Sequence, residues 1–236
     1  SDLLRILTEE HNRLPLLMKL PEAMLNLYRE GESLEQAPLA QAMEWADLIL
    51  VGPGIGTGNT ARELVAYLLS NSRLPVVLDA DALNLIAREP ALLQQASCPT
   101  VITPHLGEMA RLTGKSIAEL KEDLPAAALD FAKRFHTICV LKDARTVVAS
   151  PEGRVYINTS GCSALATAGS GDVLAGILAS LLVQQTHAPH PQPADRTVAA
   201  SVFLHGLLGE LAASQRNEAS VLAGDLIQTL TFDPLF

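Results

Sequence analysis

A glycine-rich turn at residues 167–172 (TAGSGD) places a carboxylate directly before a long apolar helical pattern. Apolar side chains recur at helical spacing as far as residue 182, so a buried helix should begin at or just after Asp172. In one interpretation, Asp172 is only the N-cap of that helix. In the other, the N–H groups of Gly169 and Gly171 face a phosphoryl group in transfer. Asp172, kept ionised by the helix dipole, then accepts a proton from a hydroxyl.

A second glycine-rich loop, at residues 51–61 (VGPGIGTGNTA), stands between a predicted strand and a predicted helix. Backbone N–H groups in such a loop can approach a phosphate, and the following helix N-terminus favours an anion. Gly56, Gly58 and Ala61 loosely match the Gly-x-Gly-x-x-Ala pattern of dinucleotide-binding units, with Asp79 18 residues farther on. A dinucleotide site, another ligand-cradling turn and a purely structural turn all fit this pattern. Neither glycine-rich segment is a Walker A loop, because no Gly-Lys-Ser/Thr sequence follows the glycines.

Polar residues also follow two other predicted strands. Asp79 and Asp81 end the apolar run at 75–81, and His105 lies in a Thr-Pro-His turn after the run at 100–103. The carboxyl ends of parallel strands form the ligand-binding edge of an open α/β sheet, so these side chains are candidates for contact with a ligand or with magnesium. Helix capping, turn formation and simple solvation are the alternatives.

The segment 140–146 (VLKDART) brings Lys142 and Arg145 into a tight connection between two β-like runs. In that position the two cations could hold nucleotide phosphates. The alternative is an exposed hairpin turn with incidental charge. We assign no metal ligands, since His187 and His190 only flank prolines in a loop.

Short apolar runs alternate with helical patterns along most of the chain, which indicates an α/β fold with a mostly parallel sheet and helices on its faces. The runs are continuous, as expected for strands buried on both sides. A Pro-Glu-Gly turn within 146–158 predicts an antiparallel hairpin. We expect a single domain over residues 1–236. The predicted strands are 3–7, 47–52, 75–81, 100–103 and 138–142, and the predicted helices are 9–20, 60–70, 82–96, 107–113, 123–135, 171–184, 195–213 and 220–230.

Composition excludes several classes of function. The 26 acidic and 17 basic side chains give a formal net charge of −9, which repels nucleic acids and anionic membrane surfaces. No stretch approaches the roughly 18 unbroken apolar residues of a membrane-spanning helix. Three widely spaced cysteines favour a reducing compartment, the cytoplasm, over a disulfide framework.

In order and spacing, five segments resemble the NAD(P)H-hydrate dehydratase family, the C-terminal domain of bifunctional NAD(P)H-hydrate repair enzymes, within the ribokinase-like superfamily. The segments are VGPGIG, DADALN, TPHLGEMARL, LKDART with the following hairpin, and TSGCSALATAGSGDVLAGI. The resemblance covers most of residues 3–230 and implies a ribokinase-like three-layer sandwich. It implies dehydration of the S-epimer of hydrated NADH or NADPH, coupled to hydrolysis of ADP to AMP and phosphate, with Mg²⁺ on the phosphates. In eukaryotic relatives the hydrolysed nucleotide is ATP.

The resemblance also implies roles for individual positions. Asp172 stands where the family has the base that activates the substrate hydroxyl. The positions implied to contact the hydrated dinucleotide are Gly54, Gly56, His105 and Asp172. Those implied to contact the nucleotide are Lys142, Asp143, Ala144, Arg145, Thr146, Gly169 and Gly171. By the same resemblance we expect a homo-oligomer, and an epimerase domain either fused to this one or acting as its partner.

The chain departs from the family pattern at a few positions. Asp143 replaces a common glycine and should repel phosphates, and Cys162 replaces an asparagine whose amide would donate and accept hydrogen bonds. Ala164 and Ala168 stand where glycine is frequent. The family domain begins with a strand, a glycine-rich turn and a helix ahead of the strand matching 3–7, so we expect this first β-α unit to be absent. We therefore expect weaker activity than the overall match implies.

Three other functions remain compatible with the same residues. A ribokinase-like kinase for a small alcohol, such as hydroxyethylthiazole or a pyridoxal-type vitamin, would share the base at Asp172. An NAD-dependent dehydrogenase would use the loop at 51–61 for hydride transfer. A non-catalytic nucleotide-binding protein would account for Asp143 and Cys162.

Overall fold

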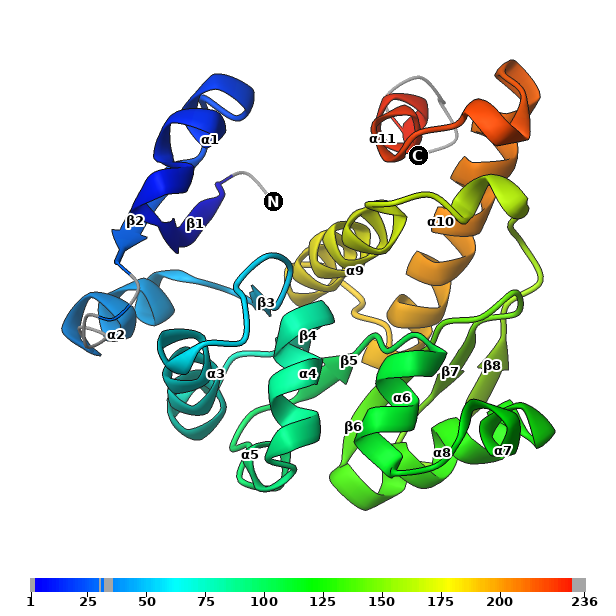
Figure 1. The fold of residues 1–236 in the computed structure, drawn as a ribbon, viewed down its shortest axis with the longest axis horizontal. Helices are drawn as coiled ribbons and strands as arrows, with labels where there is room; N and C mark the ends of the chain where they lie inside the picture. Colours follow the sequence, from blue (N-terminus) through cyan, green and yellow to red (C-terminus); the bar gives the residue numbers. More distant parts are fainter. Residues whose placement is uncertain (1–2, 30, 32–35, 231–236) are drawn as a thin grey trace.

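The structure is a computed structural model that describes residues 3–29, 31 and 36–230 (Figure 1). In this part of the chain the strands are β1 (Arg5–Glu9), β2 (Met24–Tyr28), β3 (Ile49–Val51), β4 (Val76–Leu78), β5 (Thr100–Ile102), β6 (Thr137–Leu141), β7 (Val147–Ala149) and β8 (Val155–Ile157). The α-helices are α1 (Arg13–Lys19), α2 (Gln36–Trp45), α3 (Asn59–Asn71), α4 (Ala80–Arg88), α5 (Ala91–Gln94), α6 (Leu106–Thr113), α7 (Ile117–Glu122), α8 (Leu124–Phe135), α9 (Ser170–Thr186), α10 (Ala194–Gln215) and α11 (Ala223–Leu230). Short 3₁₀ turns occupy Glu10–Asn12, Ser163–Leu165 and Glu218–Ser220.

The main sheet has six strands in the order β3-β4-β5-β6-β7-β8. Strands β3 to β6 are parallel, and β7 and β8 add an antiparallel hairpin at one edge. The mostly parallel sheet and the hairpin predicted for 146–158 are both confirmed. Because the four parallel strands end at the same edge, the turns that follow them are brought together there.

Helices cover both faces of this sheet, as Figure 1 shows. Val76 and Leu78 of β4 belong to a core shared with α3, α4, α6 and α8, whereas Val77 belongs to a second core shared with α9 and α10. Successive side chains of a strand point to opposite faces, so a strand covered on both sides must be apolar throughout. The predicted three-layer architecture is therefore confirmed.

The first strands form a separate unit. β1 pairs in parallel with β2 in a two-stranded sheet of its own, next to α1 and α2. No sequence pattern predicted β2 or α2. Several large apolar side chains of α1 are exposed, among them Leu14 and Met18.

Two predicted boundaries were wrong. β4 ends at Leu78, so Asp79 is the N-cap of α4 and Asp81 lies in the first turn of that helix rather than in the strand. The predicted helix 82–96 is divided into α4 and α5 at Pro90, since the residue before a proline disfavours helical geometry. The short helix α7 was also not predicted.

Helix α10 is long and apolar enough, by length and composition, to cross a membrane, the one such helix among the described residues. Its buried side chains, including Val198 and Val202, pack in the core with Leu174 and Leu178 of α9. This position inside the fold accounts for its apolar sequence.

Candidate active site

The N-terminus of α9 forms the centre of the candidate site. The helix begins at Ser170 and has Gly169 as its N-cap, so the prediction that it begins at or just after Asp172 was wrong. Asp172 lies in the first turn and makes no capping hydrogen bond. Gly169 has a left-handed backbone (φ 86°), and a Cβ there would stand 3.1 Å from the Ala223 Cβ, so this turn requires glycine. The first-turn N–H groups have no helical partner and are suited to an anion.

The surroundings of Asp172 raise its pKa. Partial desolvation is the main cause, repulsion by the Asp79 carboxylate is the second, and Lys142 acts in the opposite direction. The sequence predicted that the helix dipole would keep this carboxylate ionised, but burial and a like charge shift the pKa the other way. A raised pKa makes the carboxylate a better proton acceptor once it is ionised.

Lys142 connects the strand ends to α9. Its backbone N–H donates to the Pro104 carbonyl (2.8 Å), which places it beside His105 at the carboxyl edge of the sheet. Its ammonium lies 3.0 Å from Asp79 Oδ1. Lys142 Nζ also lies 3.5 Å from the point where a Cβ on Gly171 would stand, so the absence of a side chain at Gly171 leaves room for the lysine. Lys142 is therefore held between Asp79 and the first turn of α9.

Asp79 is buried, with 2% of its surface exposed. One of its carboxylate oxygens accepts two hydrogen bonds. The Thr103 hydroxyl donates to Asp79 Oδ1 at 2.7 Å, and Lys142 donates to the same atom. A buried carboxylate needs such partners to remain charged. Asp79 thus fixes a cation beside the candidate base.

The loop between β3 and α3 packs on the start of α4. Gly52 has a φ of 135°, and a Cβ on it would lie 1.7 Å from the Asp79 carbonyl oxygen, so only glycine fits. Gly54 and Gly56 are exposed and also have positive φ. The Gly56 N–H donates to Asp81 Oδ2 at 3.0 Å. Since this donor is occupied, the loop lacks the free N–H at Gly56 that a phosphate-cradling dinucleotide loop would use.

His105 is the N-cap of α6. Its Nδ1 accepts hydrogen bonds from the N–H groups of Gly107 (2.9 Å) and Glu108 (3.3 Å), and Glu108 Oε2 accepts from the His105 N–H (2.8 Å). This is a reciprocal capping box, the structural role left open by the sequence. The His105 side chain is still 55% exposed, so the ring can also contact a ligand.

The comparison with family models shows to which family the chain belongs. Residues 1–231 match the family described as NAD(P)H-hydrate dehydratase. The chain belongs to this family. A hydroxyethylthiazole kinase from Pyrococcus horikoshii also superposes on this chain, with a TM-score of 0.70 over 97% of this chain and 87% of that one. At 18% identity, this similarity shows a common fold alone.

Relatives of this dehydratase family member include longer proteins. The chain is 42% identical over 195 residues to a bifunctional NAD(P)H-hydrate repair enzyme of Moorella thermoacetica, and the match covers 83% of this chain and 36% of that one. It is 39% identical to an ADP-dependent (S)-NAD(P)H-hydrate dehydratase of Neisseria meningitidis, covering 75% of this chain and 59% of that one. The chain thus spans about a third of the length of the bifunctional relative.

A solved structure supports the same grouping. The ADP/ATP-dependent NAD(P)H-hydrate dehydratase of Bacillus subtilis, co-crystallised with ATP and Mg²⁺, is 29% identical. The two structures superpose with a TM-score of 0.78 over 97% of this chain and 77% of that one.

The rest of the predicted nucleotide segment lies in the turn from β6 to β7. Arg145 donates to the Thr159 carbonyl (2.7 Å), and the Thr146 hydroxyl donates to the Asp143 carbonyl (3.4 Å). Ala144 and Arg145 are exposed. The structure therefore brings Lys142, of this segment, to the first turn of α9, while Arg145 is directed toward Thr159.

His205 was missed by the sequence analysis. It lies on α10 with 8% of its surface exposed, and its Nε2 is 3.1 Å from the Ser170 hydroxyl at the first residue of α9. Burial, aided by the charge of Lys142, lowers the pKa of His205 to about 4, so the ring is neutral at pH 7. One signal was available: His205 is a polar residue within the otherwise apolar run VFLHGLL, and buried polar groups are normally hydrogen-bonded.

Proposed function

We propose that this chain catalyses nucleotide-dependent dehydration of the S-epimer of hydrated NADH and NADPH, with ADP as the preferred phosphoryl donor. The observation that carries the proposal is the position of Asp172. In this member of the dehydratase family, Asp172 has a raised pKa and lies in the first turn of α9, where the N–H groups lack helical partners. The ammonium of Lys142 reaches the same turn, 3.5 Å from the Cβ position of Gly171. The ADP-dependent relative from Neisseria meningitidis supports the choice of nucleotide.

In the proposed reaction, Asp172 accepts the proton of the ring hydroxyl, whose oxygen attacks the terminal phosphorus of ADP. The bond from that phosphorus to the bridging oxygen breaks, and AMP leaves. Phosphate then departs from the ring carbon with the C–O electron pair, and loss of a proton from the adjacent carbon restores the dihydropyridine. The N–H groups of Gly169 and Gly171 and the ammonium of Lys142 stabilise negative charge on the transferring group.

Magnesium fits this site as a partner of the nucleotide. Among the described residues, no group of three or more His, Cys, Asp or Glu side chains could hold a metal ion. Mg²⁺ is commonly bound by one or two carboxylates together with phosphates and water, and Asp172 and Asp79 are the nearby carboxylates here. When bound, the ion would neutralise charge on the phosphates.

The proposal also covers the cellular compartment, the oligomeric state and a partner domain. The three cysteines are free thiols, which suits the cytoplasm. A second activity, from an epimerase domain that is fused or acts as a partner, is proposed by analogy with the bifunctional relative. A homo-oligomer is proposed from the family resemblance. Sedimentation analysis would measure the oligomeric state.

The decisive experiment incubates the protein with chemically hydrated NADH, Mg²⁺ and either ADP or ATP, and follows the recovery of NADH absorbance. We expect recovery with ADP, and a loss of roughly 10²-fold to 10⁴-fold in kcat for Asp172→Asn, because the proton acceptor is removed. Asp130→Asn, an exposed aspartate on α8, is the matched control. No recovery with either nucleotide in the folded protein would refute the activity, and full activity of Asp172→Asn would refute the assigned base.

A further inference from the structure

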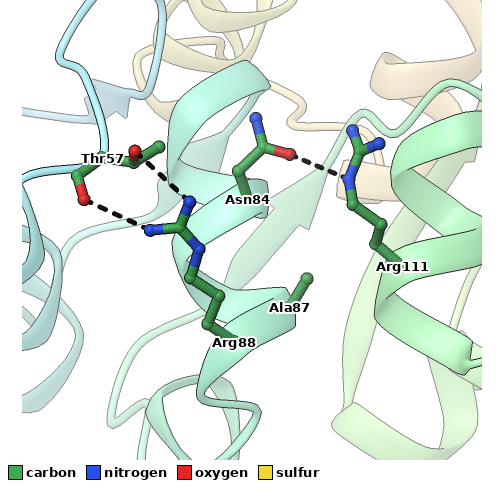
Figure 2. Close-up of a pocket in the computed structure, with 5 residues that line it drawn as sticks. All are labelled: Thr57, Asn84, Ala87, Arg88 and Arg111. Carbon is green, nitrogen blue, oxygen red and sulfur yellow. Dashed lines mark hydrogen bonds between the residues drawn. The ribbon is translucent and has the colours of Figure 1, made fainter.

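A second charged site lies along α4, a helix that begins at the carboxyl edge of the sheet, the edge at which the candidate base also lies. It is an open pocket of about 370 Å³, lined by Thr57, Asn84, Ala87, Arg88 and Arg111 (Figure 2). Loop 52–58, α4 and α6 supply these residues. The volume is in the range of small-ligand sites, and none of these residues was assigned a role above.

Within the described part of the chain, neither guanidinium group at this pocket has an anionic partner. Arg88 donates weakly to the carbonyl and hydroxyl oxygens of Thr57 (3.4 and 3.5 Å), and Arg111 Nε donates to Asn84 Oδ1 (3.1 Å). These partners are neutral, and among the described residues no carboxylate forms an ion pair with either arginine. Each guanidinium has five N–H donors, so most donors and both charges remain available to a ligand.

Two acidic residues close to Arg88 in the sequence are engaged elsewhere. Glu89, next in sequence to Arg88, pairs with Arg62 at 2.6 Å. Asp81 accepts from the Gly56 N–H and from the Asn84 amide. In a chain with a net charge of −9, two uncompensated arginines at one pocket favour an anionic ligand.

The pocket lies between the two segments that the proposed function assigns to the dinucleotide. Thr57 directly follows Gly56, and an Arg111 guanidinium nitrogen is 3.9 Å from the point where a Cβ on Gly107, in the His105 turn, would stand. α4 also sets the distance from Asp79, its N-cap, whose charge acts on the candidate base Asp172. At 1.5 Å per residue, Asn84 and Arg88 lie roughly 8 Å and roughly 14 Å along the helix from Asp79. These distances suit the phosphate-bearing part of a dinucleotide whose nicotinamide ring is at Asp172.

We propose that the pocket between α4 and α6 binds the phosphate groups of the hydrated dinucleotide through Arg88 and Arg111. Arginine forks match phosphate oxygens in geometry and charge. The inference rests on the proposed function for the identity of the ligand. The phosphates come from one of two sources, the diphosphate bridge common to both dinucleotides or the 2′-phosphate found only in the NADPH form.

The test measures binding of NADPH and of NADH, the reaction products, by their fluorescence, in wild type and in Arg88→Gln, Arg111→Gln and the double variant. Kd should rise about tenfold or more in the double variant, because charge-assisted hydrogen bonds are lost. Arg88→Lys with Arg111→Lys should recover part of the affinity by restoring charge without the fork. Arg73→Gln, an exposed arginine before β4, controls for net charge. Thermal unfolding of each variant verifies its fold.

The outcomes separate the two phosphate sources and the two proposals. Equal losses for NADH and NADPH indicate the diphosphate, and a larger loss for NADPH indicates the 2′-phosphate. In steady-state assays the KM for the hydrated dinucleotide should rise while the KM for ADP is unchanged. Unchanged Kd in the double variant, an effect on ADP alone, or wild-type protein that binds neither dinucleotide would overturn the inference. Arginine-dependent NADPH binding without dehydration would instead overturn only the proposed function.

Discussion

The ammonium of Lys142 lies 3.0 Å from the carboxylate of Asp79, although 63 residues separate the two in the chain. Lys142 follows β6 and Asp79 follows β4, so the pair spans the carboxyl edge of the sheet across β5. The lysine also reaches the first turn of α9. The contact between Lys142 and Asp79 therefore links the ends of β4 and β6 to the first turn of α9.

Replacing Asp79 by asparagine should therefore disturb both stability and proton transfer. The half-buried Lys142 would lose its counter-charge, at a cost of about 2 kcal/mol in the free energy of unfolding. Thr103→Val, which removes only the hydroxyl donor, should cost about 1 kcal/mol. Glu152→Gln, at an exposed pair with Arg154, should be nearly neutral. Urea unfolding would measure all three, and equal effects of Asp79→Asn and Glu152→Gln would contradict the role given to Asp79.

The rate of dehydration should depend on the protonation of Asp172. Its pKa lies above the ordinary value of 3.8, so kcat/KM should fall with decreasing pH at an inflection above that value. Removal of the Asp79 charge should move this inflection to lower pH, since Asp79 is one cause of the shift. The raised pKa also means that ionisation of Asp172 opposes folding as pH rises, so Asp172→Asn should be at least as stable as wild type at pH 7. A pH–rate profile insensitive to Asp79→Asn would argue against this coupling.

His205 should make the protein sensitive to moderate acid. Its folded pKa of about 4 lies below the ordinary 6.5, so the unfolded chain binds the proton first as pH falls. Stability is therefore complete above pH 6.5 and is lost down to about pH 4, by about 3 kcal/mol in total. Chemical unfolding at several pH values would measure this slope. His205→Gln should flatten it, and the exposed His190→Gln should not; an unchanged slope in His205→Gln would assign it to other groups.

The turn at Gly52 should tolerate no side chain. Gly52→Ala would place a methyl group 1.7 Å from the Asp79 carbonyl oxygen at a φ of 135°. We expect a loss of about 3 kcal/mol or more in stability, with displacement of the loop that carries Gly54 and Gly56. Gly176→Ala, in an open position within α9, should instead stabilise the protein by about 0.5–1 kcal/mol. Thermal melts of the two variants provide the comparison, and a harmless Gly52→Ala would show that the loop is not constrained by α4.

Asp143 is expected to weaken nucleotide binding. If the segment 142–146 contacts ADP, Asp143→Gly and Asp143→Asn should both lower the KM for ADP by roughly threefold, because a like charge near the phosphates is removed. The gain should shrink at high salt, where charges are screened. A gain with glycine but not with asparagine would assign the effect to backbone freedom rather than charge.

The layered α/β fold could be predicted from the sequence because its causes are local. Strands buried on both faces are continuous apolar runs, and apolar residues of a helix recur about every 3.6 residues. A Pro-Glu-Gly turn forms the β7–β8 hairpin. The glycine-rich turn before α9 and the polar residues at strand ends were found for the same reason. β2 escaped prediction, since the short run MLNLY is interrupted by Asn26.

The chemistry of the site depends on contacts between distant parts of the chain, and only the tertiary structure decided these. Burial, together with the charge of Asp79 across the sheet edge, raises the pKa of Asp172, and His205 reaches Ser170 from another helix. A pKa depends on burial and on neighbouring charges in space, neither of which follows from a local pattern. The sequence by itself determined most strands and helices of the main sheet and the side chains that they carry. Packing decided which of those side chains meet, and with them that Asp172 lies in the first turn of α9 without capping it.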